Sequence, residues 1–389
     1  MPPSTYVAVD TDALAHNLTC VRTRLADDVK LMAVVKANAY GHDTVLAAEA
    51  FASAGADWFG VSTPHDAIAL RQAGLTQPVL VFLPVLPEEL PEMIATGITA
   101  TVASVENVVE CAEAADEAQK AVNVHCYVDT GLGRIGSDDA LPDIIDACVR
   151  YPRVNLTGVY THFGPRGSGA LLGGIDALRP GASARAFARL ASDAIASAGA
   201  GRVLRHCVAS SMYLQEPKSH LDMVRIGTLL YGQGPADVDE LPFDLRKTFE
   251  LRTHIIATIT LPARSPVGYG GDFITRRETT VATLPVGLAD GVGVLPESLT
   301  GGLRYAVKQY LKRRAAAAGR TTHGPRARID GTEVPIIGRI SMDQCCLDIT
   351  DIEAGVGTEV ALEPRRTTTS PAIPRIAATI ETIEEKAEE

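Results

Sequence analysis

Short apolar runs alternate with amphipathic segments along the first 230 residues of the chain. Eight runs have the length of buried strands: residues 31–35, 58–61, 79–82, 99–102, 122–128, 156–160, 203–207 and 223–226. The segments between them are alanine-rich and have helical apolar spacing at residues 45–54, 64–73, 105–118, 141–149 and 185–198. Eight strands that alternate with helices over this length predict an α/β fold, a (β/α)8 TIM-like barrel that closes near Gly232.

The pattern changes after Gly234 to alternating runs that are typical of exposed sheets. These runs, at residues 251–261, 279–285, 327–329 and 333–340, predict a second, mostly β domain. We therefore expect a barrel domain at residues 1–238 and a β domain at 239–389. A basic insertion at residues 295–325 has a helical pattern at 305–318, which we interpret as a solvated surface helix, with a charged docking surface as the alternative. The tail after Arg365 is predicted to be a polar loop followed by a helix.

Composition narrows the class of protein and its partners. The chain has 36 basic and 47 acidic residues and a formal charge of -11, which disfavours nucleic acid as a partner. The longest apolar stretch, at residues 79–86, contains Pro84 and is too short to cross a membrane. No export signal is present at the N-terminus, so we expect a cytoplasmic protein. Seven cysteines without a Cys-x-x-Cys pair indicate neither a disulfide framework nor a metal site.

Polar residues gather where the predicted strands end, which is where barrel enzymes place their chemistry. Lys36 follows the first strand, and it is interpreted either as a solvent-exposed strand end or as a partly neutral nucleophile. The loops after the seventh and eighth strands commonly bind a phosphate group in such barrels. They contain hydroxyl and glycine residues that suit this task, namely Ser210, Ser211, Gly227 and Thr228. Taken singly, these would also fit a helix cap and a packing glycine.

The string Val-Val-Lys-Ala-Asn-Ala-Tyr-Gly-His at residues 34–42 resembles the cofactor-binding motif of alanine racemases, the fold-type III enzymes that use pyridoxal 5'-phosphate. The resemblance implies that Lys36 binds this cofactor covalently and that Tyr40 helps to hold its phosphate. It also implies that Arg225 faces the pyridine nitrogen, where a guanidinium donates a hydrogen bond without giving up its proton. A salt bridge from Arg225 to Asp222 is the structural alternative.

Three further motifs resemble the same family. Asp-Thr-Gly-Leu-Gly-Arg at residues 129–134 implies that Arg134 approaches the substrate carboxylate, and His162 would support the catalytic tyrosine. The segment at residues 267–273 implies that this tyrosine is Tyr269, the second base beside Lys36 in a two-base racemisation. The segment at residues 337–344 implies that the Met342 backbone contacts the substrate carboxylate from a partner subunit, in a head-to-tail homodimer with shared active sites.

Four positions depart from the family pattern. Leu288 and Thr382 stand where the family usually has tyrosines, Tyr127 stands where it often has a lysine, and Ser210 replaces a common asparagine. The loss of two rings predicts a wider pocket, so a larger or polar amino acid such as serine is an alternative substrate to alanine. Two other functions stay open: a fold-type III amino-acid decarboxylase, whose further motifs are not found here, and a non-catalytic pyridoxal-phosphate carrier.

Overall fold

The computed structural model describes residues 3–137, 139–163, 180–235, 238, 240–294, 307 and 326–380. It contains two compact units. The barrel unit comprises Asp12–Ala39 and Asp43–Arg246, and the β unit comprises Met1–Thr11, Tyr40–His42 and Lys247–Glu389. The hydrophobic pattern placed a single boundary between residues 238 and 239. In the structure the barrel unit instead runs on to Arg246, and two N-terminal segments group with the β unit.

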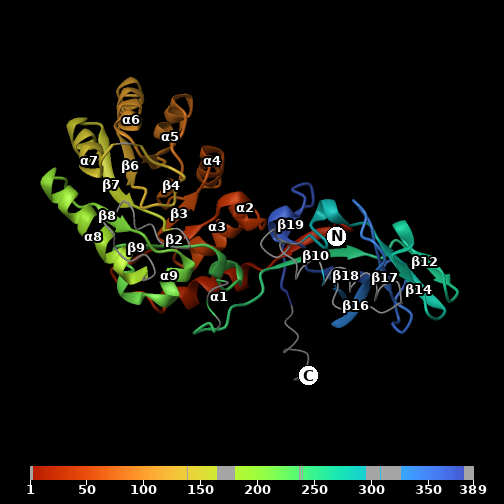
Figure 1. The fold of residues 1–389 in the computed structure, drawn as a ribbon. Helices are drawn as coiled ribbons and strands as arrows, with labels where there is room; N and C mark the ends of the chain where they lie inside the picture. The colour runs from red at the N-terminus through yellow and green to blue at the C-terminus, as the bar shows by residue number, and fades with distance from the viewer. Residues whose placement is uncertain are drawn as a thin grey trace. The chain divides into compact units, whose positions relative to one another are not determined.

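Eight parallel strands form the barrel within the described residues, as predicted (Figure 1). One sheet has the order β4-β3-β2-β9 and the other has the order β5-β6-β7-β8. Parallel bridges from Leu80 to Thr99 and from Val208 to Val224 join the two sheets into a closed ring. The strands are β2 (Lys30–Val34), β3 (Trp58–Val61), β4 (Val79–Val81), β5 (Ala100–Val102), β6 (Val122–Tyr127), β7 (Val154–Tyr160), β8 (Leu204–His206) and β9 (Met223–Ile226).

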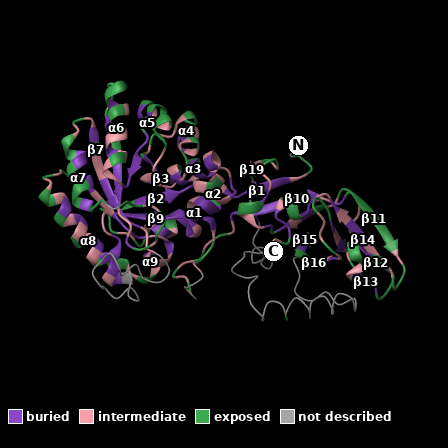
Figure 2. Cartoon of the chain, turned by 45° about the horizontal axis from the view of Figure 1, so that its top comes forward, coloured by how far each residue is buried: buried purple, intermediate pink, exposed green. Residues whose placement is uncertain are grey.

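Helices cover the outside of the barrel, and their solvent faces are exposed while the strands are buried (Figure 2). Side-chain caps begin several of them: Asp43, Thr63 and Ser104 each accept a hydrogen bond from a first-turn N–H group. The five predicted helices are confirmed as α3 (Thr44–Ser53), α4 (Pro64–Gln72), α6 (Val105–Glu117), α7 (Leu141–Arg150) and α8 (Pro180–Ser197). The sequence analysis missed α1 (Thr11–Arg22), α5 (Leu90–Thr96) and the short α9 (Ser210–Gln215).

The β unit is built on a nine-stranded sheet of order β11-β14-β17-β16-β15-β18-β10-β1-β19. The N-terminal strand β1 lies between β10, to which it is antiparallel, and β19, to which it is parallel. A separate pair is formed by β12 (Pro266–Val267) and β13 (Phe273–Ile274). The nine strands are β1 (Tyr6–Val9), β10 (Phe249–His254), β11 (Ala257–Leu261), β14 (Thr279–Leu284), β15 (Arg326–Ile329), β16 (Thr332–Ile337), β17 (Cys345–Asp348), β18 (Glu359–Leu362) and β19 (Arg375–Ala377).

Two details of this unit differ from the sequence prediction. The single strand predicted at residues 251–261 is two strands, β10 and β11, which pair with different neighbours. The tail has no helix in its described part, residues 371–380, because Arg375–Ala377 pairs with β1. The helix predicted at 305–318 lies outside the described residues apart from Val307, and residues 381–389, including Thr382, lie outside them entirely.

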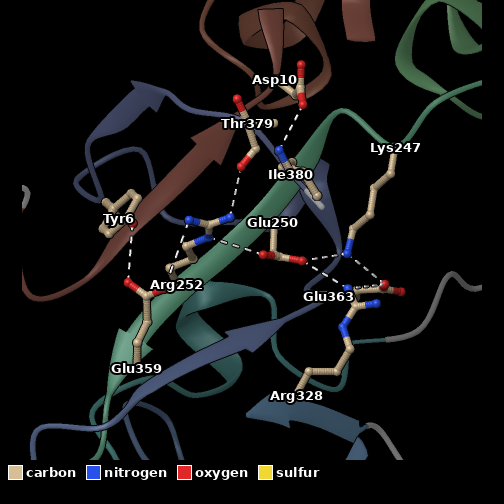
Figure 3. A network of polar contacts seen from close by, with 10 residues as sticks. All are labelled: Tyr6, Asp10, Lys247, Glu250, Arg252, Arg328, Glu359, Glu363, Thr379 and Ile380. Carbon is tan, nitrogen blue, oxygen red and sulfur yellow. Dashed lines mark hydrogen bonds and ion pairs between the residues drawn. The ribbon is translucent and has the colours of Figure 1, made fainter. Parts of the chain in front are cut away.

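A buried carboxylate organises the polar contacts of the β unit (Figure 3). The side chain of Glu250 is 7% exposed and pairs with Lys247 at 2.8 Å, Arg328 at 2.9 Å and Arg252 at 3.2 Å. Arg252 also donates to the carbonyl oxygen of Thr379 at 3.0 Å. This network therefore ties strands β10 and β15 to the C-terminal segment.

Candidate active site

Lys36 follows β2 and begins an unusual left-handed turn. The φ angles of the next four residues, Ala37 to Tyr40, are 55°, 53°, 49° and 54°. Each non-glycine residue in this conformation costs about 1–2 kcal/mol. Hydrogen bonds hold the turn: the N–H of Ala39 donates to the Val35 carbonyl at 3.0 Å, and the Asn38 side-chain oxygen accepts from the N–H of Thr44 at 3.1 Å. Backbone strain of this kind persists where the surrounding structure fixes it, often at functional sites.

The electrostatic surroundings of Lys36 favour a neutral amine. The residue is half-buried, and burial together with the positive charges of Arg134 and Arg225 lowers the pKa of its amine. A lower pKa increases the fraction of amine that carries a lone pair at neutral pH. A lowered pKa is what the interpretation of Lys36 as a partly neutral nucleophile requires, and that interpretation stays a prediction.

Arg225 is a buried cation whose described partners are all neutral. It is 4% exposed and lies on β9, where it donates to the carbonyl oxygens of His206 at 3.0 Å and Thr161 at 2.8 Å. The same guanidinium group also donates hydrogen bonds to the Nδ1 atoms of His206 at 3.0 Å and His162 at 3.4 Å. Asp222 pairs instead with Arg205, at 2.8 Å, so the salt bridge considered from sequence is not formed.

A chain of hydrogen bonds runs from Arg225 into the barrel. A guanidinium group only donates, so the Nδ1 atom of His206 accepts and its Nε2 atom carries the proton. That proton is directed to His125 Nδ1 at 3.0 Å, which places the remaining proton of His125 on Nε2. The Nε2 atom of His125 has no partner among the described residues.

The histidines around Arg225 are neutral at pH 7. Burial, followed by the charge of Arg225, lowers the pKa of His125 to about 3 and that of His162 to about 4. The same two causes hold the pKa of His206 well below its ordinary value. The sequence analysis did not assign His125 or His206 a role. The sequence feature that could have indicated His125 is its spacing from Tyr127, because residues two apart on a strand share one face.

The predicted phosphate loops meet in the structure. Ser210 is buried at the start of α9, and its Oγ atom accepts from the N–H of Gly227 at 3.3 Å. Thr228 begins a 3-10 turn directly after Gly227, and Ser211 is the next residue of α9. The loops after β8 and β9 thus place hydroxyl and backbone N–H groups together at one end of the barrel.

Arg134 stands on a loop that a single carboxylate organises. The carboxylate of Asp129 accepts hydrogen bonds from the N–H groups of Gly131, Leu132 and Gly133 at 2.8–2.9 Å. Arg134 is exposed and makes no hydrogen bond or ion pair with the described part of the chain. Tyr127, at the end of β6, is 1% exposed, and its hydroxyl likewise lacks a described partner.

The β unit brings its three predicted site segments to one edge. Gly268, beside Tyr269, lies against Arg339, since a Cβ atom added to it would be 3.3 Å from the Arg339 nitrogen. The N–H of Leu288 donates to the carbonyl oxygen of Ser341 at 2.9 Å, directly before Met342. The side chains at this edge are exposed, by 72% for Tyr269, 65% for Met342 and 40% for Leu288. The edge therefore presents a phenol and two apolar groups to its surroundings.

Tyr40 belongs to the β unit although it follows Lys36 by only four residues. Burial raises the pKa of its phenol to about 12, against the opposing effect of the positive charge of Arg366. Tyr40 is therefore protonated at neutral pH and can donate a hydrogen bond.

Two family models cover nearly the whole chain. The alanine racemase N-terminal domain matches residues 9–235, and the alanine racemase C-terminal domain matches residues 248–387. The chain belongs to the alanine racemase family. The resemblance found in its motifs is thereby confirmed, as is the barrel with a mostly β second domain.

Relatives and solved structures of this family match most of the chain. Alanine racemase 1 of Caldanaerobacter subterraneus subsp. tengcongensis is 31% identical over 97% of this chain and 90% of its own length. The alanine racemase of Frankia casuarinae is 33% identical over 91% of this chain and 85% of its own. The structure of alanine racemase from Streptomyces lavendulae has a TM-score of 0.78 and 28% identity, covering 98% of each chain. That of Bacillus anthracis, with bound L-Ala-P, has a TM-score of 0.77 and 27% identity over 97% and 96%.

Two kinds of feature are absent from the described residues. No helix there is long and apolar enough to span a membrane. No group of three or more His, Cys, Asp or Glu side chains in that part of the chain is arranged to hold a metal ion.

Proposed function

We propose that this protein is a pyridoxal-phosphate-dependent amino-acid racemase that interconverts L- and D-alanine. The observation that carries the proposal is Lys36, a half-buried amine at the end of a barrel strand whose pKa is lowered by burial, Arg134 and Arg225. A structural lysine at a strand end would not need two arginines close enough to act on it. The family relatives named alanine racemase support the choice of reaction.

The donor groups of the barrel unit fit this cofactor. Lys36 would attach it, Arg225 would face its ring nitrogen, and the phosphate would be held by the hydroxyl and N–H groups of Ser210, Ser211, Gly227 and Thr228. The assignment of the Tyr40 hydroxyl to the phosphate stays a prediction from the motif. When bound, pyridoxal phosphate withdraws electrons from the amino acid and acidifies the proton on the α carbon. The surplus of cations and neutral donors at these positions suits a cofactor and a substrate that both carry negative charge.

The chain's own residues would then divide the proton transfers. Lys36 serves one face of the α carbon, and Tyr269 of the partner subunit serves the other. Arg225 keeps its proton, so it donates a hydrogen bond without transferring one. His162 is neutral, and because its Nδ1 atom faces Arg225, its Nε2–H group is available to support the tyrosine.

Substrate binding is assigned to Arg134 and to the main chain of Met342, both directed at the carboxylate. A guanidinium fork can bind a carboxylate through two parallel hydrogen bonds. The exposure of Tyr269 and Met342 on a single chain agrees with a head-to-tail homodimer in which the partner covers them. The dimer and the cytoplasmic location stay predictions.

The test is α-proton exchange in deuterated water, with chirality analysis, on a panel of L-amino acids. The expected result is fastest exchange and D-isomer formation with L-alanine, abolished in Lys36→Ala. In Tyr269→Phe, exchange from one enantiomer should fall far more than exchange from the other, since each base serves one face. Release of CO2 would indicate a decarboxylase, and cofactor binding without exchange would indicate a carrier.

A second candidate, a racemase of a larger or polar amino acid such as serine, is favoured by Leu288. Its N–H is bonded to the Ser341 carbonyl, and the N–H of Ala289 is bonded to that of Met342 at 2.8 Å, so Leu288 stands beside the proposed carboxylate contact. A leucine occupies less volume than a tyrosine. If serine exchanges faster than alanine, and Leu288→Tyr reverses this order, the second candidate replaces the first.

A further inference from the structure

The hydrogen bonds of Arg225 do not account for how its charge is tolerated inside the barrel. Its described acceptors are two carbonyl oxygens and two imidazole nitrogens, all of them neutral. Burial of an ionised group is costly unless the group is paired. A guanidinium is planar and donates within its plane, so the flat face of the group is left for another kind of contact.

The aromatic ring of Tyr160 meets that face. The Cζ atom of Arg225 lies over this ring, 5.5 Å from its centroid. Both residues are buried, with Tyr160 3% and Arg225 4% exposed. A cation within about 6 Å of a ring centroid is attracted to the negative face of the ring, and the attraction is largest where water is excluded. Tyr160 therefore stabilises the charge of Arg225 in a place where no described carboxylate does.

The Tyr160 ring is itself held by groups other than Arg225. Its hydroxyl donates to the carbonyl oxygen of Phe82 at 2.9 Å and lies 2.9 Å from the hydroxyl of Thr101. The imidazole of His206 is stacked on the ring, with centroids 4.9 Å apart and planes 2° from parallel, and the ring of Tyr127 meets it edge-on at 5.1 Å. Because these contacts come from four other strands or their ends, the orientation of the ring does not depend on Arg225.

The same ring is in contact with the imidazole that accepts a hydrogen bond from Arg225. The Nδ1 atom of His206 is 3.0 Å from the guanidinium, and its ring is the one stacked on Tyr160. Hydrogen bonds tolerate a misalignment of roughly 30° before they weaken. The acceptors thus fix where the guanidinium lies, and the contact with the ring limits how far its plane can tilt.

We propose that Tyr160 is a positioning residue, whose ring holds the guanidinium of Arg225 in the direction needed to hydrogen-bond the ring nitrogen of the cofactor. The inference rests on the proposed function, because that function assigns Arg225 to the ring nitrogen. Tyr160 acts through Arg225, and it does so with the face of its ring. Phenylalanine at this position should therefore serve, whereas an aliphatic side chain should not.

The first test is nuclear magnetic resonance on the full-length chain, without cofactor and with ¹⁵N-labelled arginine. Protons over the face of an aromatic ring are shielded by its ring current. The side-chain N–H resonance of Arg225, assigned by its loss in Arg225→Lys, should move downfield in Tyr160→Leu and keep its position in Tyr160→Phe. This measurement requires neither bound cofactor nor activity.

The second test is the rate of α-proton exchange with L-alanine in the holoenzyme. In Tyr160→Leu, kcat should fall about tenfold or more, as expected for the loss of a desolvated cation–π contact. KM should stay within about twofold of wild type, because the lost contact does not involve the substrate. Tyr160→Phe should keep kcat within about twofold.

Tyr213→Leu is the matched control for a loss of packing. Tyr213 is 1% exposed, its ring is stacked on His220 at 5.0 Å, and its hydroxyl donates to the carbonyl oxygen of Val21 at 2.8 Å. No described cation lies over its ring. Tyr213→Leu should therefore lower Tm as Tyr160→Leu does and leave the Arg225 resonance in place. If Tyr160→Leu does not fold, Tyr160→Met also removes the aromatic face and replaces it in both tests.

The contrary results separate the inference from the proposed function. An unmoved Arg225 resonance in Tyr160→Leu would overturn the inference, as would an unchanged kcat. Equal losses in the leucine and phenylalanine variants would assign the effect to the hydroxyl and overturn it as well. If the wild-type holoenzyme exchanged the α-proton of no amino acid, the proposed function itself would be overturned, whatever the resonance shows.

Discussion

Gly158 is the position where a single added methyl group should act on the histidine chain behind Arg225. It lies on β7 directly opposite His125 of β6. A Cβ atom at this position would be 2.6 Å from Cε1 and 2.7 Å from Cγ and Cδ2 of the imidazole ring. Favourable carbon contacts need about 3.5 Å, so the His125 ring must move by about 1 Å in Gly158→Ala.

The expected loss of stability in Gly158→Ala has two parts. Overpacking of a buried site costs about 1–3 kcal/mol. A movement of this size also breaks the 3.0 Å hydrogen bond between His125 and His206, a loss of about 0.5–1.5 kcal/mol. The sum of about 1.5–4.5 kcal/mol corresponds to a fall in Tm of roughly 3–18 °C for a unit of this size.

Thermal unfolding followed by fluorescence of Trp58 is the assay, because this one tryptophan lies 5.1 Å from the His125 ring. Gly201→Ala is the matched control, since a Cβ atom there meets nothing within 4 Å, and its Tm should be nearly unchanged. Adding His125→Ala to Gly158→Ala should restore part of the loss through non-additivity. A Tm of Gly158→Ala within about 1 °C of wild type would refute the packing argument.

Three further predictions concern charge. Arg134→Gln removes one of the positive charges that lower the pKa of Lys36, so the pH at which cofactor attachment becomes fast should shift upward in a rate-against-pH profile. Because the pKa values of the three barrel histidines are lowered, the free energy of unfolding should decrease as pH falls from about 6.5 towards 4, as monitored by denaturant titrations with Trp58 fluorescence. Glu250→Ala leaves three cations around a buried position and should destabilise the β unit by about 3–5 kcal/mol, whereas Glu333→Ala, which breaks an exposed pair with Arg326, should cost at most about 1 kcal/mol. Denaturant titrations followed by far-UV circular dichroism measure both, because Trp58 lies in the barrel unit.

The barrel could be predicted because each of its strands has a recognisable local sequence pattern. Each strand is a short apolar run between helical segments, and the fold rule then assigns function to strand ends. Lys36, His162 and Arg225 were selected as candidates in this way, and their roles stay predictions. Arg134 lies close enough to Lys36 for the arginine charge to act on the amine. The loops that carry Ser210 and Gly227 also meet as expected.

The missed features depend on long-range pairing or on conformations that run against local preference. Strand β1 joins the C-terminal sheet through partners about 245 positions away, such as Tyr6 with Arg252. A local sequence pattern does not indicate which distant strand it will pair with. The turn after Lys36 places alanine, asparagine and tyrosine in the left-handed region, where propensity alone would never put them in succession. The chain from Arg225 to His125 requires the register of three strands.

The strand register also determines which groups surround Arg225. An acidic residue, Asp222, lies three positions before Arg225, and proximity in sequence suggested that the two would pair. Asp222 instead lies directly before β9 and forms an ion pair with Arg205. The described partners of Arg225 are thereby all neutral. Burial is the main cause of the lowered pKa values of Lys36, His125, His162 and His206, and the charge of Arg225 lowers each of them further. A carboxylate beside Arg225 would oppose the effect of its charge and raise those pKa values towards their ordinary range, so the separation of Asp222 from Arg225 favours the proposed chemistry.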